Sequence, residues 1–237
     1  MKLSVVLALI VSVANGEYLR GIDVSHYQGT INWTEVAGSG ISFAMAKATE
    51  GTKTLDTTFP TNFKGISDAG MIRGAYHFAH PGSDAVAQAD FFVQTVLSAG
   101  GWNASKTMQL VLDLESNDGL GADDVWGWVQ AWTARVKVLT GRPPIVYTGY
   151  YFWRDSVGAS NNLDMPLWIA SYSSPDPVGI PTPWASVGWA FWQYNDNGAS
   201  EPGGGAETIP GIAGTSVDVD YFMNGGAYPS LEALCFS

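Results

Sequence analysis

The sequence predicts an α/β protein built as a modified TIM-like barrel, in which five strand–helix units are followed by three helix-poor strands. Two patterns support this prediction. Apolar segments of strand length alternate with segments of helical periodicity through the first two thirds of the chain, and the last third has strand-like segments joined by loops rich in proline and glycine. The 237 residues suffice for one closed barrel, and no linker or internal repeat interrupts them.

The elements follow from periodicity and from residues that begin or end them. The clearest helix, 123–139, has one apolar stripe, acidic residues Asp123 and Asp124 in its first turn and Gly141 after its end. Ser83 is the expected N-cap of the helix at 83–97. The expected strands cover residues 21–29, 41–48, 72–79, 109–115, 144–148, 167–171, 189–194 and 216–222. The other helices are expected at 57–69 and 150–157, with a single turn at 32–38.

The N-terminus has the pattern of a secretory signal peptide. Lys2 precedes an apolar run at 3–13, and small residues follow, so we expect cleavage near Gly16 and a mature domain spanning 17–237. The apolar run is too short to span a membrane as a stable helix. We therefore expect a secreted, extracellular protein that acts as a monomer. Two sequons, at Asn32 and Asn103, are possible glycosylation sites in a eukaryotic host.

Composition narrows the class of ligand. The formal net charge of −11 argues against nucleic acid and anionic membranes as partners. Tryptophan, tyrosine and phenylalanine number ten each against eleven basic residues, which favours a neutral ligand that stacks on aromatic rings, such as a sugar. The single cysteine, Cys235, excludes an intrachain disulfide and is interpreted as a small buried apolar residue.

Two acidic side chains inside an apolar strand are the strongest chemical signal. Asp113 and Glu115 lie two residues apart, so on a strand they point to the same face, about 6.6 Å apart along it. Acids that cap a loop or pair with Arg or Lys would be the simpler explanation, but basic residues are scarce. Closure of a barrel would also bring Asp23 of the first strand beside Asp218 of the last. A cluster of four carboxylates on one face is the chemistry of glycoside cleavage.

Eight segments, in order, carry a family resemblance. They are GIDVSHYQG at 21–29, KATEG at 47–51 followed by Asp56, GAYHFAHP at 74–81, LVLDLE at 110–115, PIVYTGYYFW at 144–153, LWIASY at 167–172, FWQY at 191–194 and VDVDYF at 217–222. The chain resembles glycoside hydrolase family 25, the Chalaropsis-type lysozymes or N,O-diacetylmuramidases. Ala46 and Thr54 depart from the family pattern, and both lie off the carboxylate positions.

The resemblance implies hydrolysis of the β-1,4 bond between N-acetylmuramic acid and N-acetylglucosamine in bacterial peptidoglycan, without a cofactor. It implies that Glu115 is the general acid, that Asp113 assists it, and that Asp23 and Asp218 are the remaining site acids. The stereochemical route stays open between inversion, direct displacement and assistance by the substrate's 2-acetamido group, and we favour assistance.

Further binding residues are expected among polar and aromatic side chains in strands. We expect Tyr76, Phe78, Tyr147, Trp168 and Gln193 to contact substrate, although aromatic residues in strands, Trp192 included, are about as often core.

The charged and histidine residues near the strand ends suggest no further chemistry. Lys47 and Glu50 are expected to form a structural pair at the rim. His77 and His80 are three residues apart and should not face the same way, so no metal site is expected.

Two alternatives remain. A chitinase-like barrel also uses an Asp-x-Glu pair, but Val111 and Gln109 stand where such enzymes usually carry further aspartates. A carbohydrate-binding barrel without catalysis would be expected to lack the acid Glu115.

Overall fold

A computed structural model describes residues 18–102, 106–159, 163–172, 176–177, 179–196, 208–214 and 217–237. The expected signal peptide and the Asn103 sequon lie outside the described residues, so both stay predictions. Asn32 is described: it is exposed, and its side chain accepts a hydrogen bond from the Glu35 backbone N–H and so caps a short helix.

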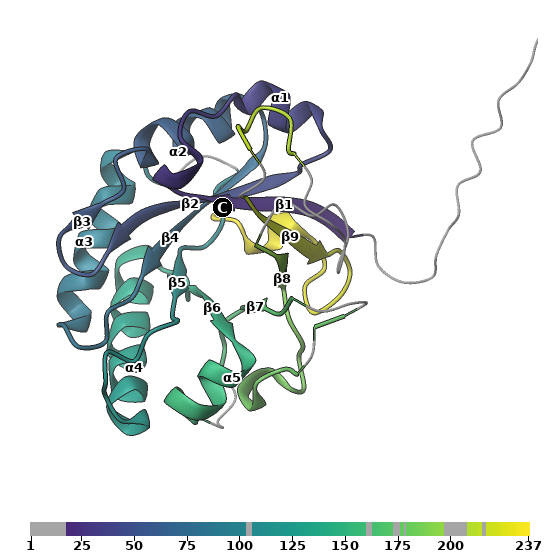
Figure 1. The fold of residues 1–237 in the computed structure, drawn as a ribbon. Helices are drawn as coiled ribbons and strands as arrows, with labels where there is room; N and C mark the ends of the chain where they lie inside the picture. Colours follow the sequence, from purple (N-terminus) through teal and green to yellow (C-terminus); the bar gives the residue numbers. More distant parts are fainter. Residues whose placement is uncertain are drawn as a thin grey trace, which may run out of the picture.

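Five strand–helix units come first, as the sequence predicts (Figure 1). They are β1 (Tyr18–Val24) with α1 (Trp33–Gly38), β2 (Phe43–Glu50) with α2 (Phe59–Asp68), β4 (Ile72–Phe78) with α3 (Ala85–Ser98), β5 (Val111–Asp113) with α4 (Ala122–Thr140), and β6 (Ile145–Gly149) with α5 (Tyr150–Phe152) and the π-turn Trp153–Val157. The short strand β3 (Thr54–Leu55) extends β2 as a hairpin. The last strands are β7 (Leu167–Ala170), β8 (Phe191–Asn195) and β9 (Asp218–Met223). In the described residues between β7 and β9, the 3₁₀ turn Thr182–Trp184 is the one helical element.

The sheet closes on itself, which confirms the barrel. The strand order is β1-β9-β8-β7-β6-β5-β4-β2-β3, and β1 also pairs with β2, so among the strands of the described residues β3 alone lies outside the ring. Helices cover the barrel from α1 to α5, whereas the described residues on the β7–β9 side form no comparable layer (Figure 1). Neighbouring strands from β1 to β8 along the ring are parallel, and β9 is antiparallel to both β1 and β8.

The reversed direction of β9 changes how its acidic residue reaches the site. In a parallel barrel, functional side chains collect at the C-terminal ends of the strands. Asp218 is the first residue of β9, and the antiparallel register places it opposite Asp23 near the C-terminal end of β1. The predicted neighbourhood of Asp23 and Asp218 is therefore confirmed, but it depends on a reversal that the local pattern does not reveal.

Two local predictions need correction. Strand β5 covers only Val111–Asp113 instead of 109–115, so Glu115 follows the strand, although the Leu114 N–H still donates to the Tyr147 carbonyl. Helix α3 is capped by Asp84, whose carboxylate accepts from the Ala87 N–H, and not by Ser83. An acidic side chain is as good an N-cap as serine, so adjacent candidates are hard to separate by sequence.

Alternation along the strands divides the core into two regions. Leu110, Leu112 and Leu114 pack outward against the helices, and Trp192 lies in this outer region too, so it does not face the interior. Val111 faces the barrel interior, as Asp113 must by the same alternation. Interior residues such as Phe43, Met45, Ile145, Phe191, Phe222, Leu231 and Leu234 are almost completely buried. The C-terminal turn Leu231–Leu234 closes the barrel at the end where the parallel strands begin. The end where these strands finish stays open.

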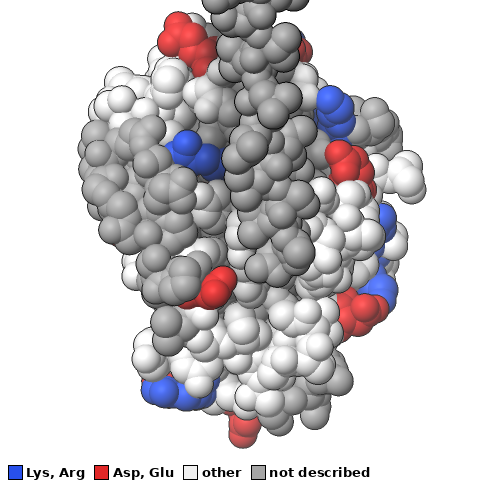
Figure 2. Space-filling model, turned by 90° about the vertical axis from the view of Figure 1, so that its right-hand side faces the viewer, with Lys and Arg blue, Asp and Glu red and all other residues white. Residues whose placement is uncertain are grey.

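Basic and acidic side chains are interspersed on one face of the molecule. On the face seen in Figure 2, the described Lys and Arg side chains lie apart from one another, and Asp and Glu side chains lie between them. Within the described part of the chain, no helix has the length and apolar composition needed to cross a membrane.

Candidate active site

A cavity of about 440 Å³ opens at the C-terminal ends of the parallel strands. The nine site residues predicted from sequence all line it: Asp23, Asp113, Glu115, Asp218, Tyr76, Phe78, Tyr147, Trp168 and Gln193. They come from β1, β4, β5, β6, β7, β8 and β9 and from the loop after β5. The barrel thus gathers side chains that are up to 195 positions apart in the chain.

Asp113, the last residue of β5, and Glu115, in the loop after it, form the first pair of acids. Asp113 is buried, and desolvation, followed by the negative charge of Glu115, raises its pKa well above the usual range. Glu115 is accessible from the cavity, yet desolvation by the surrounding walls raises its pKa also, against the opposing effects of its hydrogen bond with Asp113 and of Lys47. A pair of carboxyl groups in this state retains protons at a pH where isolated carboxyl groups have lost them.

Asp23 and Asp218 form the second pair, across the β1–β9 junction. Desolvation and the charges of Asp218 and Asp220 raise the pKa of Asp23 well above normal, although Gln193 Nε2 donates to Asp23 Oδ2 at 2.7 Å. Desolvation, with the negative charges of Asp196 and Glu115, raises the pKa of Asp218 to about 6. The carboxylates on both sides of the cavity thus bind protons more tightly than free acids do.

Aromatic and amide side chains join the two pairs. Tyr147 and Trp168 are in edge contact with ring centroids 4.6 Å apart, and Tyr76 contacts the same indole. The Tyr147 hydroxyl donates to Gln193 Oε1 at 2.8 Å, and Tyr172 donates to the same oxygen at 2.9 Å. Because its proton is used in this way, Tyr147 can meet a ligand only through its oxygen lone pairs or its ring.

Several residues in or near the cavity lining were not predicted as site residues, among them Tyr172, Tyr27, Lys47 and Asp220. Tyr172 contacts Gln193 as above, and Tyr27 lines the opening with 82% of its surface exposed. Lys47 forms the expected pair with Glu50 at 2.7 Å, but it also lines the cavity and lies 4.8 Å from the Phe78 ring centre. The alternation in VDVDYF could have identified Asp220, since residues two apart share a face.

Asp220 lies deeper than the other acids. It is fully buried, and its Oδ1 accepts from Trp168 Nε1 at 2.8 Å, while its Oδ2 has no hydrogen-bond partner. Burial, followed by the charge of Asp218, raises its pKa well above normal. The indole of Trp168 is therefore fixed from behind by an acid that does not line the cavity.

The histidines and the cysteine have other surroundings. His77 is buried between Thr49 and Gln88, and desolvation lowers its pKa to about 4. Cys235 is buried, and burial raises its pKa to about 11. Among the described residues, no group of three His, Cys, Asp or Glu side chains is arranged to hold a metal ion.

A cavity with paired carboxyl groups and aromatic walls, at the open end of a β/α barrel, fits the chemistry of glycoside cleavage. Residues 22–202 match the family Glycosyl hydrolases family 25. The chain belongs to this family, and it is an enzyme that hydrolyses glycosidic bonds.

Characterised relatives agree with this assignment. The chain is 38% identical over 229 residues to "Lysozyme M1" of Streptomyces globisporus, covering 91% of this chain and 71% of that protein. It is 35% identical over 191 residues to the "N,O-diacetylmuramidase" of Chalaropsis sp, covering 75% and 88%.

Solved structures have the same fold. The bacterial lysozyme of Streptomyces coelicolor superposes with a TM-score of 0.78 at 35% identity, covering 91% of this chain and 94% of that one. The family GH25 lysozyme of Aspergillus fumigatus superposes with a TM-score of 0.77 at 30% identity, covering 93% and 100%.

Proposed function

We propose that the protein is a secreted lysozyme that cleaves the β-1,4 bond between N-acetylmuramic acid and N-acetylglucosamine in bacterial peptidoglycan. The observation that carries this proposal is the Asp113–Glu115 pair, in which an accessible carboxyl group with a raised pKa lies beside a buried one. Relatives whose names include lysozyme and N,O-diacetylmuramidase support the choice of substrate.

Glu115 acts as the general acid in this proposal. A general acid must be protonated when the substrate arrives, and the raised pKa of Glu115 extends its protonated state toward neutral pH. It donates its proton to the glycosidic oxygen, and the leaving sugar departs as a neutral alcohol. The remaining ring carries developing positive charge at its anomeric carbon, which nearby carboxylates stabilise.

Asp113 assists by orienting the substrate. Its Oδ1 has no hydrogen-bond partner in the free protein, which fits a group that accepts a hydrogen bond from the substrate's acetamido N–H. Held in this way, the acetamido oxygen is the nucleophile of an assisted route, the one we favour over inversion or direct displacement. Asp23 and Asp218 stabilise positive charge from the opposite side, and the rings of Tyr76, Phe78, Tyr147 and Trp168, with Gln193, position the sugars.

Hydrolysis of purified peptidoglycan, with the new reducing ends identified by mass spectrometry, tests this function. We expect N-acetylmuramic acid ends from the wild type and none from Glu115→Gln. Glu232→Gln is the matched control, because it makes the same chemical change at an exposed position on the closed end of the barrel. A parallel assay on chitin separates the alternative: cleavage of chitin alone would contradict the proposal, as would binding of glycan without cleavage.

A further inference from the structure

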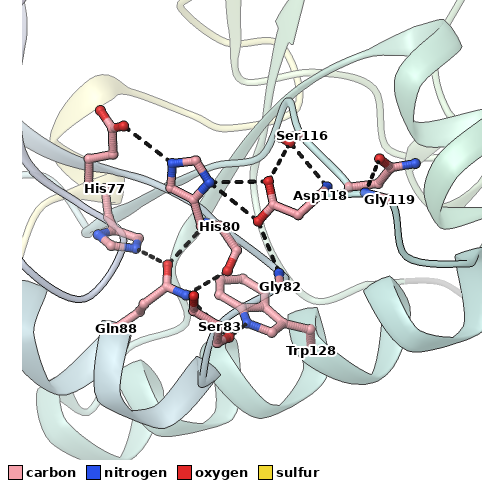
Figure 3. Close-up of polar contacts among 11 residues, drawn as sticks. His77, His80, Gly82, Ser83, Gln88, Ser116, Asp118, Gly119 and Trp128 are labelled. Carbon is pink, nitrogen blue, oxygen red and sulfur yellow. Dashed lines mark hydrogen bonds and ion pairs between the residues drawn. The ribbon is translucent and has the colours of Figure 1, made fainter.

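A buried histidine and a glutamine fix the loop that follows β4. His77 Nε2 donates to Gln88 Oε1 at 2.9 Å, because its Nδ1 accepts from the Thr49 hydroxyl and its lowered pKa keeps the ring neutral. The same Gln88 accepts from the His80 backbone N–H at 3.1 Å and donates to the His80 carbonyl at 2.7 Å. The backbone of His80 is therefore held without help from its own side chain (Figure 3).

The imidazole of His80 lies between two carboxylates from different elements. Its Nδ1 is 3.1 Å from Asp118 Oδ1 in the loop between β5 and α4, and its Nε2 is 3.2 Å from Glu50 Oε1 at the end of β2. The side chain of His80 is 37% exposed, and those of Asp118 and Glu50 are 23% and 33% exposed. The His80 ring thus connects the end of β2 with the loop between β5 and α4, and we call its contacts with Asp118 and Glu50 the two arms of the His80 bridge.

Asp118 is the anchor of the loop that carries Glu115. Its carboxylate accepts from the Gly82 backbone N–H at 3.0 Å and from the Ser116 hydroxyl at 2.8 Å, in addition to its contact with His80 (Figure 3). With φ at 48°, it is the only non-glycine residue in the left-handed region among those the structure describes. Such a conformation costs about 1 kcal/mol or more and persists where surrounding contacts hold it.

The second arm of the bridge, the contact of His80 with Glu50, leads to a residue that lines the cavity. Glu50 Oε2 accepts from Lys47 Nζ at 2.7 Å, so the contact with His80 fixes the carboxylate that orients this ammonium group. Lys47 lines the cavity and lowers the pKa of both Asp113 and Glu115. The Asp118 arm thus leads to the loop that carries Glu115, and the Glu50 arm leads to the ammonium group of Lys47.

We propose that His80 is a positioning residue of the hydrolase, which aligns Glu115 through Asp118 and Lys47 through Glu50. This inference rests on the proposed function, in which Glu115 is the general acid. Both arms are needed, because a general acid requires a fixed distance to the glycosidic oxygen, and a displacement of about 1 Å can cost on the order of 100-fold in rate.

The bridge depends on the protonation state of His80. An imidazolium ring donates to Asp118 and Glu50 at once, whereas the neutral ring carries one N–H and serves only one of them. Partial burial lowers the pKa of His80, but the hydrogen bonds and charges of Asp118 and Glu50 outweigh this and raise it overall. Besides these two acids, the ring faces Phe78, the neutral His77 and, beyond Glu50, Lys47. The complete bridge is present below the pKa of His80 and is lost as pH rises through it.

Steady-state kinetics on soluble peptidoglycan fragments test the inference. We expect His80→Ala and Asp118→Asn each to lower kcat about tenfold with KM changed less than twofold, and the double variant to lose no more than either alone. Asparagine keeps the left-handed backbone accessible at position 118. The ratio of wild-type to His80→Ala kcat should fall as pH rises through the pKa of His80, and His80→Arg, which keeps two donors and its charge, should restore part of the rate.

A matched control variant and a separate measurement on Glu115→Gln make the result decisive. Arg135→Gln breaks a similarly exposed ion pair with Asp90 between α3 and α4 and should leave kcat unchanged. Unchanged kcat in His80→Ala, a change confined to KM, additive losses with Asp118→Asn, or a pH-independent ratio would each overturn the inference. If Glu115→Gln is inactive while His80→Ala behaves as wild type, only this inference fails; if Glu115→Gln is fully active, the proposed function fails with it.

Discussion

The acids inside the cavity and the acids on its rim have opposite environments. Asp23, Asp113 and Asp218 face the cavity, and burial together with other carboxylates raises the pKa of each. Asp56 and Asp118 do not line the cavity, and we call them the rim acids. Partial desolvation raises the pKa of each, but hydrogen bonds from backbone N–H groups, hydroxyl groups and histidines outweigh it and lower the pKa.

The difference in pKa between the two groups of acids follows from which of them have hydrogen-bond donors and positive charges nearby. Eleven Lys and Arg residues cannot neutralise twenty-two acidic ones, and the histidines His26 and His80 lie beside Asp56 and Asp118. In the cavity, desolvation and repulsion between acids outweigh the effects of Lys47 and Gln193 on the pKa values of the acids, which costs stability. In the proposed mechanism, these raised pKa values keep protons available for catalysis.

Removal of the proposed acid should have the largest effect on activity. We expect Glu115→Gln to lower the rate of peptidoglycan hydrolysis by about 1,000-fold, within the range for loss of a general acid. Its melting temperature should not fall, because the substitution removes a charge from a crowded cluster. A loss smaller than tenfold in an assay of reducing ends would contradict the role of Glu115.

Removal of a rim acid should instead destabilise the fold. Asp56 is buried, and its carboxylate accepts from the Thr58 hydroxyl and backbone and from the His26 backbone and ring. Asp56→Ala should lower the free energy of unfolding by about 2–4 kcal/mol at pH 7, measured with urea. Because the pKa of Asp56 is lowered by folding, this contribution is present above the unfolded pKa and disappears as pH falls through the folded pKa. An equal loss at pH 7 and at pH 2 would contradict the assignment.

The pH dependence of activity sharpens the comparison further. The raised pKa of Glu115 keeps the acid protonated in mild acid, and activity should be lost about tenfold per pH unit as pH rises above that pKa. Repulsion between an anionic wall and a protein of net charge −11 acts in the same direction at low salt. We expect the optimum below pH 7 in a lysis profile, and an alkaline optimum would refute this expectation.

Removal of the charge of the buried acid Asp220 should change the free energy of unfolding less than Asp56→Ala does, and in the opposite direction. Its pKa is raised by folding, so its contribution to stability is fully present below the unfolded pKa and is lost as pH rises through the folded pKa. Asp220→Asn keeps an acceptor for Trp168 and removes the charge, so it should raise the free energy of unfolding by about 1 kcal/mol at pH 8 and change it little at pH 3. If Asp220→Asn lowers the free energy of unfolding more at pH 8 than at pH 3, the ionised Asp220 does not destabilise the fold and the prediction is wrong.

An exposed ion pair should have the smallest effect. Lys64 and Asp68 pair on the surface of α2, with side chains 71% and 62% exposed. Lys64→Ala should change the free energy of unfolding by less than about 0.5 kcal/mol, because solvent and salt screen such pairs. A loss above 1 kcal/mol in urea titrations, persisting in 0.5 M salt, would mean that an exposed ion pair stabilises the fold about as much as the hydrogen bonds of the rim acids do.

Much of the fold and the site could be predicted because the signals are local. Helical periodicity located α4 to within one residue at each end, since one apolar stripe must face the sheet. The two-residue spacing of Asp113 and Glu115 predicted a shared face, which holds even though Glu115 lies beyond the strand. Polar and aromatic side chains in the expected strands predicted five substrate-contacting residues, Tyr76, Phe78, Tyr147, Trp168 and Gln193, and all five line the cavity.

The sequence by itself thus determined the strand–helix alternation, the inward-facing acids and the family. Only the tertiary structure decided the direction of β9, the burial of Asp220 beneath Trp168, and the bridge from Asp118 through His80 to Glu50. Periodicity reports which face of an element a residue occupies and carries no information about the element across from it. Contacts between residues 30 or more positions apart depend on how the barrel closes, and closure is a property of the whole packed chain.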